Sequence, residues 1–199
     1  MGTETLEGSQ PKNFFGSELR DGKIYAQNMH VCVEERYPTA YNLGCGGKLW
    51  DGWINVDVTD EADLKADLRK LPILSDSADA VAAIHVVEHF VFWEVEPMLL
   101  EWKRILKPNG KMIIELPCMD KVFGYVANCV NNHNDLMPFM TLHALWGDPG
   151  HKEDGMTHRW GWFQKPLVAM LEHVGMREVK VCEPRYHFRF RDMRIEAVK

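Results

Sequence analysis

Asn42-Leu-Gly-Cys-Gly-Gly47 is the most informative segment of this sequence. It follows the short apolar run 39–43, which predicts a buried strand that ends at Gly44. Glycine at such a turn adopts backbone conformations that other residues disfavour, and it lets a ligand approach the main chain closely. In open parallel sheets, ligands bind in the crevice beyond the carboxyl end of a strand. The segment therefore predicts a strand, a tight turn and a ligand site.

The sequence after this turn alternates between strand-like and helical patterns. Strands are expected at 53–58, 64–67, 78–87 and 111–116, and helices from about Pro97 to 106 and at 164–173. The run 78–87 is apolar at nearly every position, which is typical of a parallel strand covered by helices on both sides. The segments 177–182 and 188–198 predict a closing hairpin. The fold class is therefore α/β, with seven strands in a mainly parallel sheet, helices on both faces and a C-terminal antiparallel edge hairpin.

The regular pattern divides the chain into an arm and one domain. Residues 1–35 are expected to form an N-terminal arm, and residues 36–199 a single domain. Within the domain, residues 118–163 are rich in Met, Trp, His and Gly and show weak periodicity. We interpret this segment as a partly helical insertion and as a candidate lid over a substrate pocket.

The composition favours a cytoplasmic protein with a small-molecule partner. The formal net charge of −6 gives the chain no overall positive field to attract nucleic acid. The five cysteines are odd in number and include no CxxC pair, which argues against a disulfide framework and against a zinc–thiolate site. No apolar run approaches the ~20 residues that cross a bilayer, and residues 1–11 are too polar for a signal peptide. We expect no nucleic-acid partner and no membrane insertion, and both a monomer and a homodimer stay open.

The glycine turn predicts a ligand that has an adenosyl group and no phosphate. A dinucleotide fingerprint would place a third glycine at the position of Leu49, and the chain contains no GxxxxGK[ST] phosphate loop. Asp57 ends the second expected strand, where a carboxylate can accept hydrogen bonds from both ribose hydroxyls. Asp67 follows the third expected strand. Each acid could also be a solvated loop residue, but their order and spacing after the turn favour a ligand site.

Several segments of the chain, in order, resemble the methyltransferase type 11 family. They are Asn42-Leu-Gly-Cys-Gly46, Gly52-Trp-Ile-Asn-Val-Asp57, Ala66-Asp-Leu-Arg-Lys-Leu-Pro72, Val86-Val-Glu-His89 and Ile105-Leu-Lys-Pro-Asn-Gly110. The likeness covers residues 40–117, and residues 158–176 resemble a later segment of such enzymes. The resemblance implies a class I, Rossmann-like methyltransferase that uses S-adenosyl-L-methionine and releases S-adenosyl-L-homocysteine.

The resemblance also implies which residues hold this cofactor. Gly44 and Gly46 would face its methionine and ribose, Asp57 would hold the ribose, and His85 would lie beside the transferred methyl. Asp67 and Leu68 would flank the adenine. The complete set of candidate cofactor residues is Asn42, Gly44, Cys45, Gly46, Asp57, Val58, Asp67, Leu68 and His85.

Two features depart from the family pattern and motivate a second hypothesis. The family usually has an acid at the position of Asn42, and an amide forms hydrogen bonds but cannot balance a charge. Ten residues separate Gly46 from Asp57, which leaves room for only a very short first helix. The alternative is a non-catalytic, methyltransferase-like module that binds the cofactor or a protein partner.

The expected reaction is an in-line methyl transfer (EC 2.1.1.-) to an oxygen, nitrogen or carbon of a small-molecule acceptor. The protein would contribute mainly by aligning the two reactants. Candidates for a base that removes the acceptor's proton are Glu88, His89, His151 and His158. The last two belong to the histidines of the insertion, which also include His133 and His143 and which could instead be surface or packing residues. No metal is required by this chemistry.

A rival motif overlaps the same region. His85-Val-Val-Glu-His89 matches the H-x-x-E-H pattern of zinc proteases, in which both histidines lie on one helix and share a metal. Because an apolar strand run precedes His85, we expect this segment to span a strand end and a loop. The metalloprotease is therefore a remote alternative, which a tightly bound zinc ion would favour.

Overall fold

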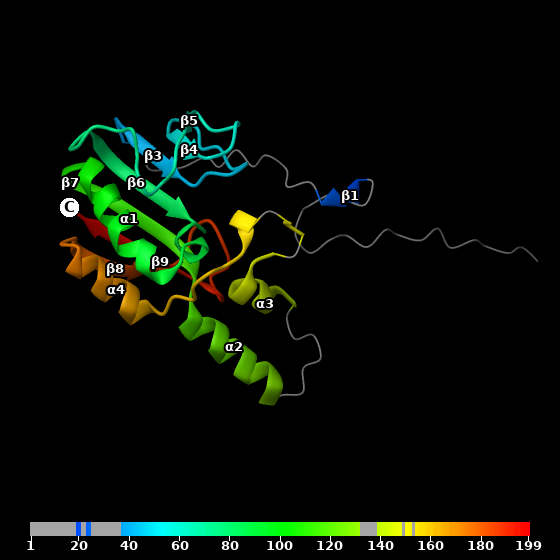
Figure 1. Ribbon diagram of the computed structural model, residues 1–199. Coiled ribbons are helices and arrows are strands. Elements are labelled where there is room, and N and C mark those ends of the chain that lie inside the picture. The colour runs from blue at the N-terminus through cyan, green and yellow to red at the C-terminus, as the bar shows by residue number, and fades with distance from the viewer. Residues whose placement is uncertain (1–18, 21–22, 25–36, 132–138, 149, 153) are drawn as a thin grey trace, which may run out of the picture.

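The computed structural model describes residues 19–20, 23–24, 37–131, 139–148, 150–152 and 154–199. Seven strands form one mixed sheet in the order β5-β4-β3-β6-β7-β9-β8 (Figure 1). The strands are β3 (Ala40–Leu43), β4 (Ile54–Asp57), β5 (Leu64–Lys65), β6 (Ala78–Ile84), β7 (Leu106–Pro117), β8 (Arg177–Cys182) and β9 (Asp192–Val198). The strands β3 to β7 are parallel, and β9 is antiparallel to both β7 and β8. This confirms the predicted seven-stranded, mainly parallel sheet with a C-terminal antiparallel hairpin.

The described part of the arm contains a separate short hairpin, β1 (Leu19–Arg20) with β2 (Lys23–Ile24). The remaining arm residues, like His133, lie outside the described residues. None of the described helices is long and apolar enough to cross a membrane.

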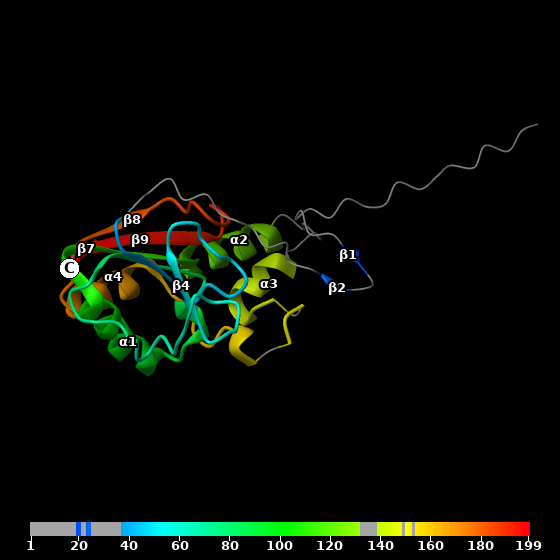
Figure 2. The ribbon, with the colours of Figure 1, turned by 90° about the horizontal axis from the view of Figure 1, so that it is seen from above.

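Two helices cover one face of the sheet. These are α1 (Phe92–Ile105) and α4 (Gln164–His173), and Figure 2 shows both on the same side of the strands. Apolar residues of α1 recur at helical spacing and are buried against the inward side chains of β3, β6, β7 and β9. Pro97 lies in the second turn of α1 instead of the first, because the helix begins at Phe92. Residues 107–110 form an irregularity within β7, where Leu106 pairs with Ala78 and Lys111 pairs with Ala80.

The second face of the sheet differs from the prediction of helices on both faces. Its apolar cluster contains Ala40, Trp50, Trp53, Ala80, Ala82 and Ile113, and no described helix contributes to it. The connection between β3 and β4 spans only residues 44–53, which is too short for a helix and its turns. The large rings of Trp50 and Trp53, in edge-to-face contact at 5.1 Å between centroids, cover this face instead.

The segment 118–163 leaves the sheet and returns to it at one point. Cys118 pairs with Trp162 through a parallel bridge, and the N–H of Met119 donates to the carbonyl of Trp162 at 2.9 Å. Between these points lie α2 (Met119–Asn131), α3 (Phe139–Trp146) and a 3-10 turn at Asp154–Met156. Figure 1 shows α2 and α3 beyond the carboxyl ends of the parallel strands. The segment is therefore partly helical, and its role as a lid stays a prediction.

Candidate cofactor and acceptor site

The site is centred where the strand order changes direction. β3 pairs with β4 on one side and with β6 on the other, so the carboxyl ends of β3 and β6 are adjacent. Leu43 and Ala83 are partners in this register, which places the glycine turn after β3 beside His85 after β6. Such a switch point is the usual ligand crevice of open α/β sheets.

The two glycines of the turn have different roles. Both have positive φ, +68° at Gly44 and +49° at Gly46. A Cβ atom at Gly44 would lie 2.5 Å from Cγ2 of Val86, so this glycine lets the turn pack against the strand next to it. A Cβ atom at Gly46 would have no neighbour within 4 Å. The open side of the turn is therefore at Gly46.

Asp57 ends β4 and faces this open side. Its Oδ2 accepts a hydrogen bond from the N–H of Gly46 at 2.8 Å, and its Oδ1 accepts from Val58 and Thr59 at 2.7 and 3.2 Å. A carboxylate has about four lone-pair sites, so it can still accept from a ligand hydroxyl. Oγ1 of Thr59 is buried with no hydrogen-bond partner among the described residues. Asp57 and the turn thus fit the ribose end of an adenosyl group, whereas the side chain of Val58 is exposed.

Asn42 stabilises the loop that connects β3 to β4. Its side chain is buried, and Nδ2 donates to the carbonyl of Lys48 at 3.0 Å and to Oδ1 of Asn55 at 2.9 Å. Oδ1 of Asn55 also accepts from the N–H of Trp50 at 2.8 Å. Both side chains therefore organise the loop that replaces a first helix. The sequence analysis did not identify Asn55 as a residue of the site. The feature that could have indicated it is a polar amide side chain within a strand of mostly apolar, β-branched residues.

The space on the enclosed side of the turn is small. A cavity of about 30 Å³ is lined by Asn42, Gly44, Cys45, Lys48, Trp50, Ile84, Tyr186 and His187. Ligand pockets for small molecules are ~300–1,000 Å³, so the methionine end of the cofactor does not fit this cavity as it stands. Burial, reinforced by Asp57, raises the pKa of Cys45 to about 12, and the thiol lining the cavity stays protonated.

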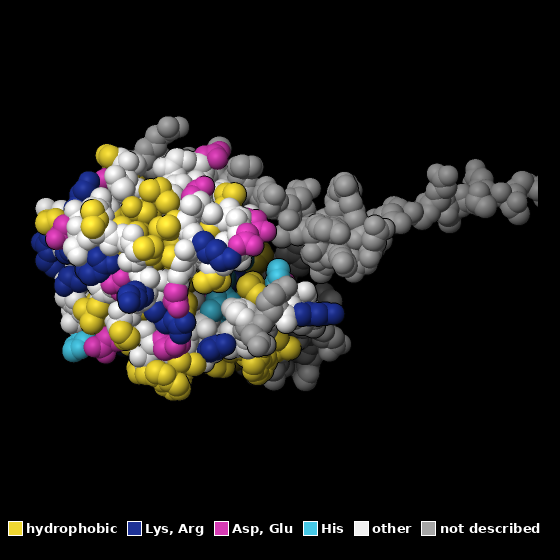
Figure 3. Space-filling view, turned by 45° about the horizontal axis from the view of Figure 1, so that its top comes forward, with side chains coloured by type: hydrophobic (Ala, Val, Ile, Leu, Met, Phe, Trp, Pro, Cys, Tyr) yellow, Lys and Arg dark blue, Asp and Glu magenta, His cyan; other side chains and the backbone are white. Residues whose placement is uncertain are grey.

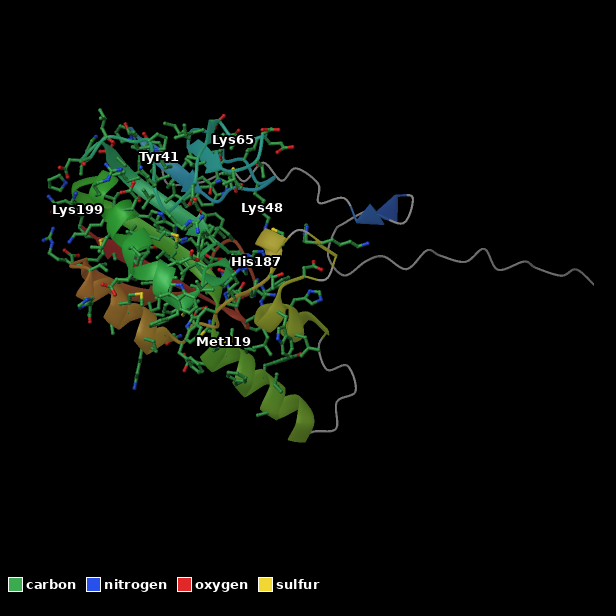
Figure 4. The ribbon with its side chains drawn as sticks, viewed as in Figure 1. Tyr41, Lys48, Lys65, Met119, His187 and Lys199 are labelled. Carbon is green, nitrogen blue, oxygen red and sulfur yellow. The ribbon has the colours of Figure 1, made fainter. Side chains whose placement is uncertain are left out.

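The segment 183–191 closes this cavity. Glu115, fully buried on β7, accepts the N–H groups of Arg185 and Tyr186 at 2.9 and 3.0 Å. This anchors Tyr186 over Trp50, with ring centroids 4.6 Å apart. Figure 4 shows Lys48 and His187 near each other at this end of the sheet, and their Nζ and Nε2 atoms are 3.4 Å apart. These residues come from the far end of the chain, and the sequence analysis did not place them here.

The two residues expected to flank the adenine, Asp67 and Leu68, lie in different environments. Asp67 is at the surface in an ion pair with Arg69, at 2.7 Å between Oδ2 and Nη2, and this hydrogen bonding lowers the pKa of the Asp67 carboxyl. Leu68 is buried beneath Gly44, and its carbonyl accepts from Nε1 of Trp102 at 3.0 Å.

His85 is held between two buried carboxylates. Its φ of +55° is unusual for a residue with a side chain. Its Nδ1 lies 3.0 Å from Oε1 of Glu88, and its Nε2 lies 3.1 Å from Oδ2 of Asp192. Burial alone would lower the pKa of His85, but the two carboxylates outweigh it and raise that pKa above its ordinary value. The two carboxylates therefore favour the protonated form of His85.

Three of the four candidate bases come together. Glu88 and His89 lie on the 3-10 turn Val87–His89, and the N–H of Arg159 donates to the carbonyl of Glu88 at 2.7 Å, which docks the returning insertion there. The rings of His89 and His158 are 4.8 Å apart and perpendicular. His151, the fourth candidate, is exposed and belongs to neither His-containing cluster of the described residues. In the space-filling view, histidine side chains are visible on the face drawn (Figure 3).

The protonation states of this group differ. Burial would raise the pKa of Glu88, but the charge of His85 outweighs it and lowers the pKa to about 2. Glu88 is therefore a weak base. Burial lowers the pKa of His158 below its ordinary value, so its ring is neutral at neutral pH, the state that a base requires.

The H-x-x-E-H pattern lacks its helical context. His85 follows the end of β6, and helical structure in the motif is limited to the single 3-10 turn at Val87–His89. Both ring nitrogens of His85 face carboxylates, Glu88 and Asp192. The expected strand end and loop are confirmed, and the metalloprotease arrangement is not formed.

Comparisons with known proteins agree with this fold. A methyltransferase from Archaeoglobus fulgidus, described as dependent on S-adenosylmethionine, aligns over 81% of this chain and 86% of its own, with 16% identity and a TM-score of 0.57. One from Methanosarcina mazei aligns over 81% of this chain and 92% of its own, with 17% identity and a TM-score of 0.54. No curated protein matches the chain. Residues 43–114, which carry the glycine turn, Asp57 and His85, match the family described as "Methyltransferase domain". Over residues 43–114 the chain thus resembles the methyltransferase family, and its fold is that of the Rossmann-like, S-adenosylmethionine-dependent methyltransferases with which it aligns.

Proposed function

We propose that this protein transfers a methyl group from S-adenosylmethionine to a small-molecule acceptor at the carboxyl ends of β3 and β6. The observation that carries the proposal is the pairing of the Gly46 N–H with Asp57 on the open side of the glycine turn. This pairing aims a carboxylate with spare acceptor capacity at a space free of side chains. The family match over residues 43–114 includes both residues.

We assign a role in cofactor binding to each residue from the position of its side chain or main chain. Asp57 would accept hydrogen bonds from the ribose, and the main chain at Gly46 would lie against the adenosyl group. When bound, S-adenosylmethionine supplies a methyl group on a positively charged sulfur, which is a good leaving group. The chain's contribution is to hold the acceptor in line with that methyl at near-attack distance.

The proton acceptor would come from the group beside the insertion. His158 is neutral at neutral pH, and its ring lies against His89. The carboxylates beside His85 raise its pKa and favour its protonated form, and Glu88 has a low pKa, so both would orient their neighbours and not remove a proton. We therefore assign His158 as the base when the acceptor needs one, with the insertion as a lid over the acceptor.

The small acceptor and the cytoplasmic location are supported by charge and cysteine chemistry. The net charge is −6, and on the face drawn in Figure 3 basic and acidic side chains are mixed. Nucleic-acid binding usually needs a continuous basic surface. Cys45, Cys118 and Cys182 are free thiols, as expected in a reducing compartment.

Titration calorimetry with S-adenosylhomocysteine tests cofactor binding, and release of that product from S-adenosylmethionine tests turnover. We expect binding at one site per chain and product release with some members of a panel of small phenols, amines, thiols and carboxylic acids. His158→Gln should retain binding and lose turnover, whereas His173→Gln, an exposed histidine on α4, should change neither. Absence of binding would reject the proposal.

A second candidate is a non-catalytic methyltransferase-like module. The observation that favours it is the enclosed cavity of about 30 Å³, which Tyr186 and His187 close. Binding of the methionine end requires these side chains to shift. Binding of S-adenosylhomocysteine without turnover across the acceptor panel would favour this second function.

A further inference from the structure

Glu88, His89 and His158 form a compact group of metal-ligand atoms. One ligand atom from each residue lies within 4.8 Å of the other two. Two of the residues belong to the 3-10 turn after β6, and the third belongs to the end of the insertion. The N–H groups of Arg159 and Trp160 both donate to the carbonyl of Glu88, at 2.7 and 3.2 Å, which fixes the two segments against each other.

Both histidines present a free ring nitrogen with a lone pair. Nδ1 of His158 lies 3.0 Å from the carbonyl oxygen of Ala144, and Nδ1 of His89 lies 3.3 Å from that of Thr157. A carbonyl oxygen can only accept, so each Nδ1 carries a hydrogen, and Nε2 is the ring nitrogen that can bind a metal. Metal-binding histidines characteristically donate their other ring N–H to a backbone carbonyl in this way, which fixes the ring orientation.

Glu88 provides a buried carboxylate with one oxygen that has no hydrogen-bond partner in the part of the chain that the structure describes. Its side chain is 2% exposed, and Oε2 has no hydrogen-bond partner among the described residues. Oε1 lies near ring nitrogens of two histidines, 3.0 Å from Nδ1 of His85 and 4.0 Å from Nε2 of His158. A buried carboxylate oxygen without a hydrogen bond is costly, and a metal ion bound to Oε2 would remove this cost.

We propose that Glu88, His89 and His158 bind a divalent transition-metal ion of the Zn²⁺ class, through the Glu88 carboxylate and the Nε2 atoms of both histidines. Tetrahedral zinc with bonds of ~2.1 Å requires ligand atoms about 3.4 Å apart, so small side-chain rotations would complete the site. Two histidines and one carboxylate leave a coordination position for water or a substrate atom, as in catalytic zinc sites. The site uses Glu88 and His89 of the H-x-x-E-H segment but replaces His85 by His158.

The neighbouring group His85, His187 and Asp192 also has closely spaced ligand atoms but is already occupied by protein cations. Lys48 Nζ lies 3.4 Å from Nε2 of His187, and Arg191 Nη2 lies 3.3 Å from its Nδ1. Arg191 also pairs with Asp192 at 2.7 Å. Two cations at this group oppose a third positive ion, so the proposal concerns the first group alone.

Metal content of the full-length protein tests the proposal without any assay of methyl transfer. The protein is stripped with a chelator, dialysed against one equivalent of Zn²⁺ per chain in competition with a chromophoric chelator, and analysed by plasma mass spectrometry. Co²⁺ substitution gives a second readout, because cobalt in a tetrahedral N/O site absorbs in the visible range. We expect about one bound ion per chain and a cobalt spectrum.

Variants separate this site from the other histidines. His158→Gln and His89→Gln should each weaken binding at least tenfold, in line with the loss of one ligand, and should abolish the cobalt spectrum. His187→Asn tests the neighbouring group, His173→Gln tests an exposed histidine, and both should bind the ion as the unmodified protein does. Circular dichroism verifies that each variant is folded.

Two results would overturn the proposal: no ion on the folded chain above the background of a blank dialysis, or equal affinity in the protein and in His158→Gln. Because cofactor binding is measured separately, failure of the metal site leaves the proposed methyltransferase function unaffected. A bound ion would make His158 a ligand instead of a base, so turnover of the stripped protein distinguishes these two roles.

Discussion

The main-chain N–H of Gly46 donates a hydrogen bond of 2.8 Å to Oδ2 of Asp57, from the turn after β3 to the end of the neighbouring strand β4. The bond aims the carboxylate at the open side of the glycine turn. The bond also fixes the connection between β3 and β4. This connection is a ten-residue loop without a helix, and the bond ties its first turn to Asp57, the last residue of β4. The same carboxylate therefore supports the turn and faces the proposed ribose site.

Replacing Asp57 should weaken cofactor binding more than it weakens the fold. Hydrogen bonds to a charged group contribute about 1.5–3 kcal/mol, so Asp57→Asn should reduce S-adenosylhomocysteine affinity by roughly tenfold to a hundredfold. Calorimetry measures this change. Asp60→Asn, an exposed acid three residues further on, is the matched control and should bind normally. Equal affinities in the two variants would remove Asp57 from the site.

Introducing the acid that the family usually has at position 42 should destabilise this protein. Nδ2 of Asn42 donates to the carbonyl of Lys48 and to Oδ1 of Asn55, and the carboxylate of Asn42→Asp would face both oxygens without a hydrogen to donate. Unsatisfied buried polar groups cost about 1–3 kcal/mol, and we expect a loss of this size in the free energy of unfolding. Urea denaturation measures it. Unchanged stability together with tighter cofactor binding would instead show that position 42 serves the ligand.

Alanine at the two glycines of the turn should have unequal effects. Gly44→Ala places a Cβ atom 2.5 Å from Val86, whereas Gly46→Ala meets open space, and both positions have positive φ. Overpacking costs about 1–3 kcal/mol beyond the cost of the backbone conformation, so Gly44→Ala should be the less stable variant by this amount. Adding Val86→Ala should recover part of the loss. Similar stabilities for the two single variants would contradict the packing role of Gly44.

Stability should fall as the pH decreases from about 6.5 towards 4, in part because of His187. Burial lowers the pKa of His187 from 6.5 to about 4, with His85 and Lys48 acting in the same direction and Asp192 opposing them. In this window the unfolded chain binds a proton at His187 and the folded chain does not, so protons favour unfolding. Above pH 6.5 the residue is neutral in both states and contributes nothing to the pH dependence.

The change attributable to His187 is at most about 1.4 kcal/mol per pH unit within this window. Urea denaturation at several pH values, in the unmodified protein and in His187→Asn, isolates it from the other titrating groups. The variant should show a shallower loss of stability between pH 6.5 and 4. Parallel curves would mean that His187 is protonated in the folded state as readily as in the unfolded chain.

Local patterns along the chain were sufficient to predict most of the sheet. The apolar runs that became β3 and β6, and the helical spacing that became α1 and α4, depend on which side chains are buried, and this is visible in the periodicity. The acid at the end of β4 was predicted beside the glycine turn for a similar reason, since carboxyl ends of parallel strands meet at one edge. The sequence analysis did not predict that the described part of the second face of the sheet is covered by Trp50 and Trp53 instead of a helix. The length of a loop does not reveal how well two indole rings cover a sheet.

The residues missed at the site come from distant parts of the chain. Asp192 lies 107 residues after its partner His85, and Tyr186 and His187 reach the glycine turn through an anchor on Glu115. No periodicity connects such positions, and their meeting depends on the placement of β9 beside β7. His158 joins Glu88 and His89 because the insertion returns to the point at which it left the sheet.

The amino-acid sequence by itself determined the order of strands and helices, the glycine turn and the acid opposite it, because these depend on side-chain burial and on backbone freedom within a few residues. Tertiary structure decided which ionisable groups share the site and in which state. The pKa values of His85, Glu88 and His158 follow from burial and from charges that folding brings together. Both depend on the three-dimensional arrangement of the side chains, which the distance between residues along the chain does not give.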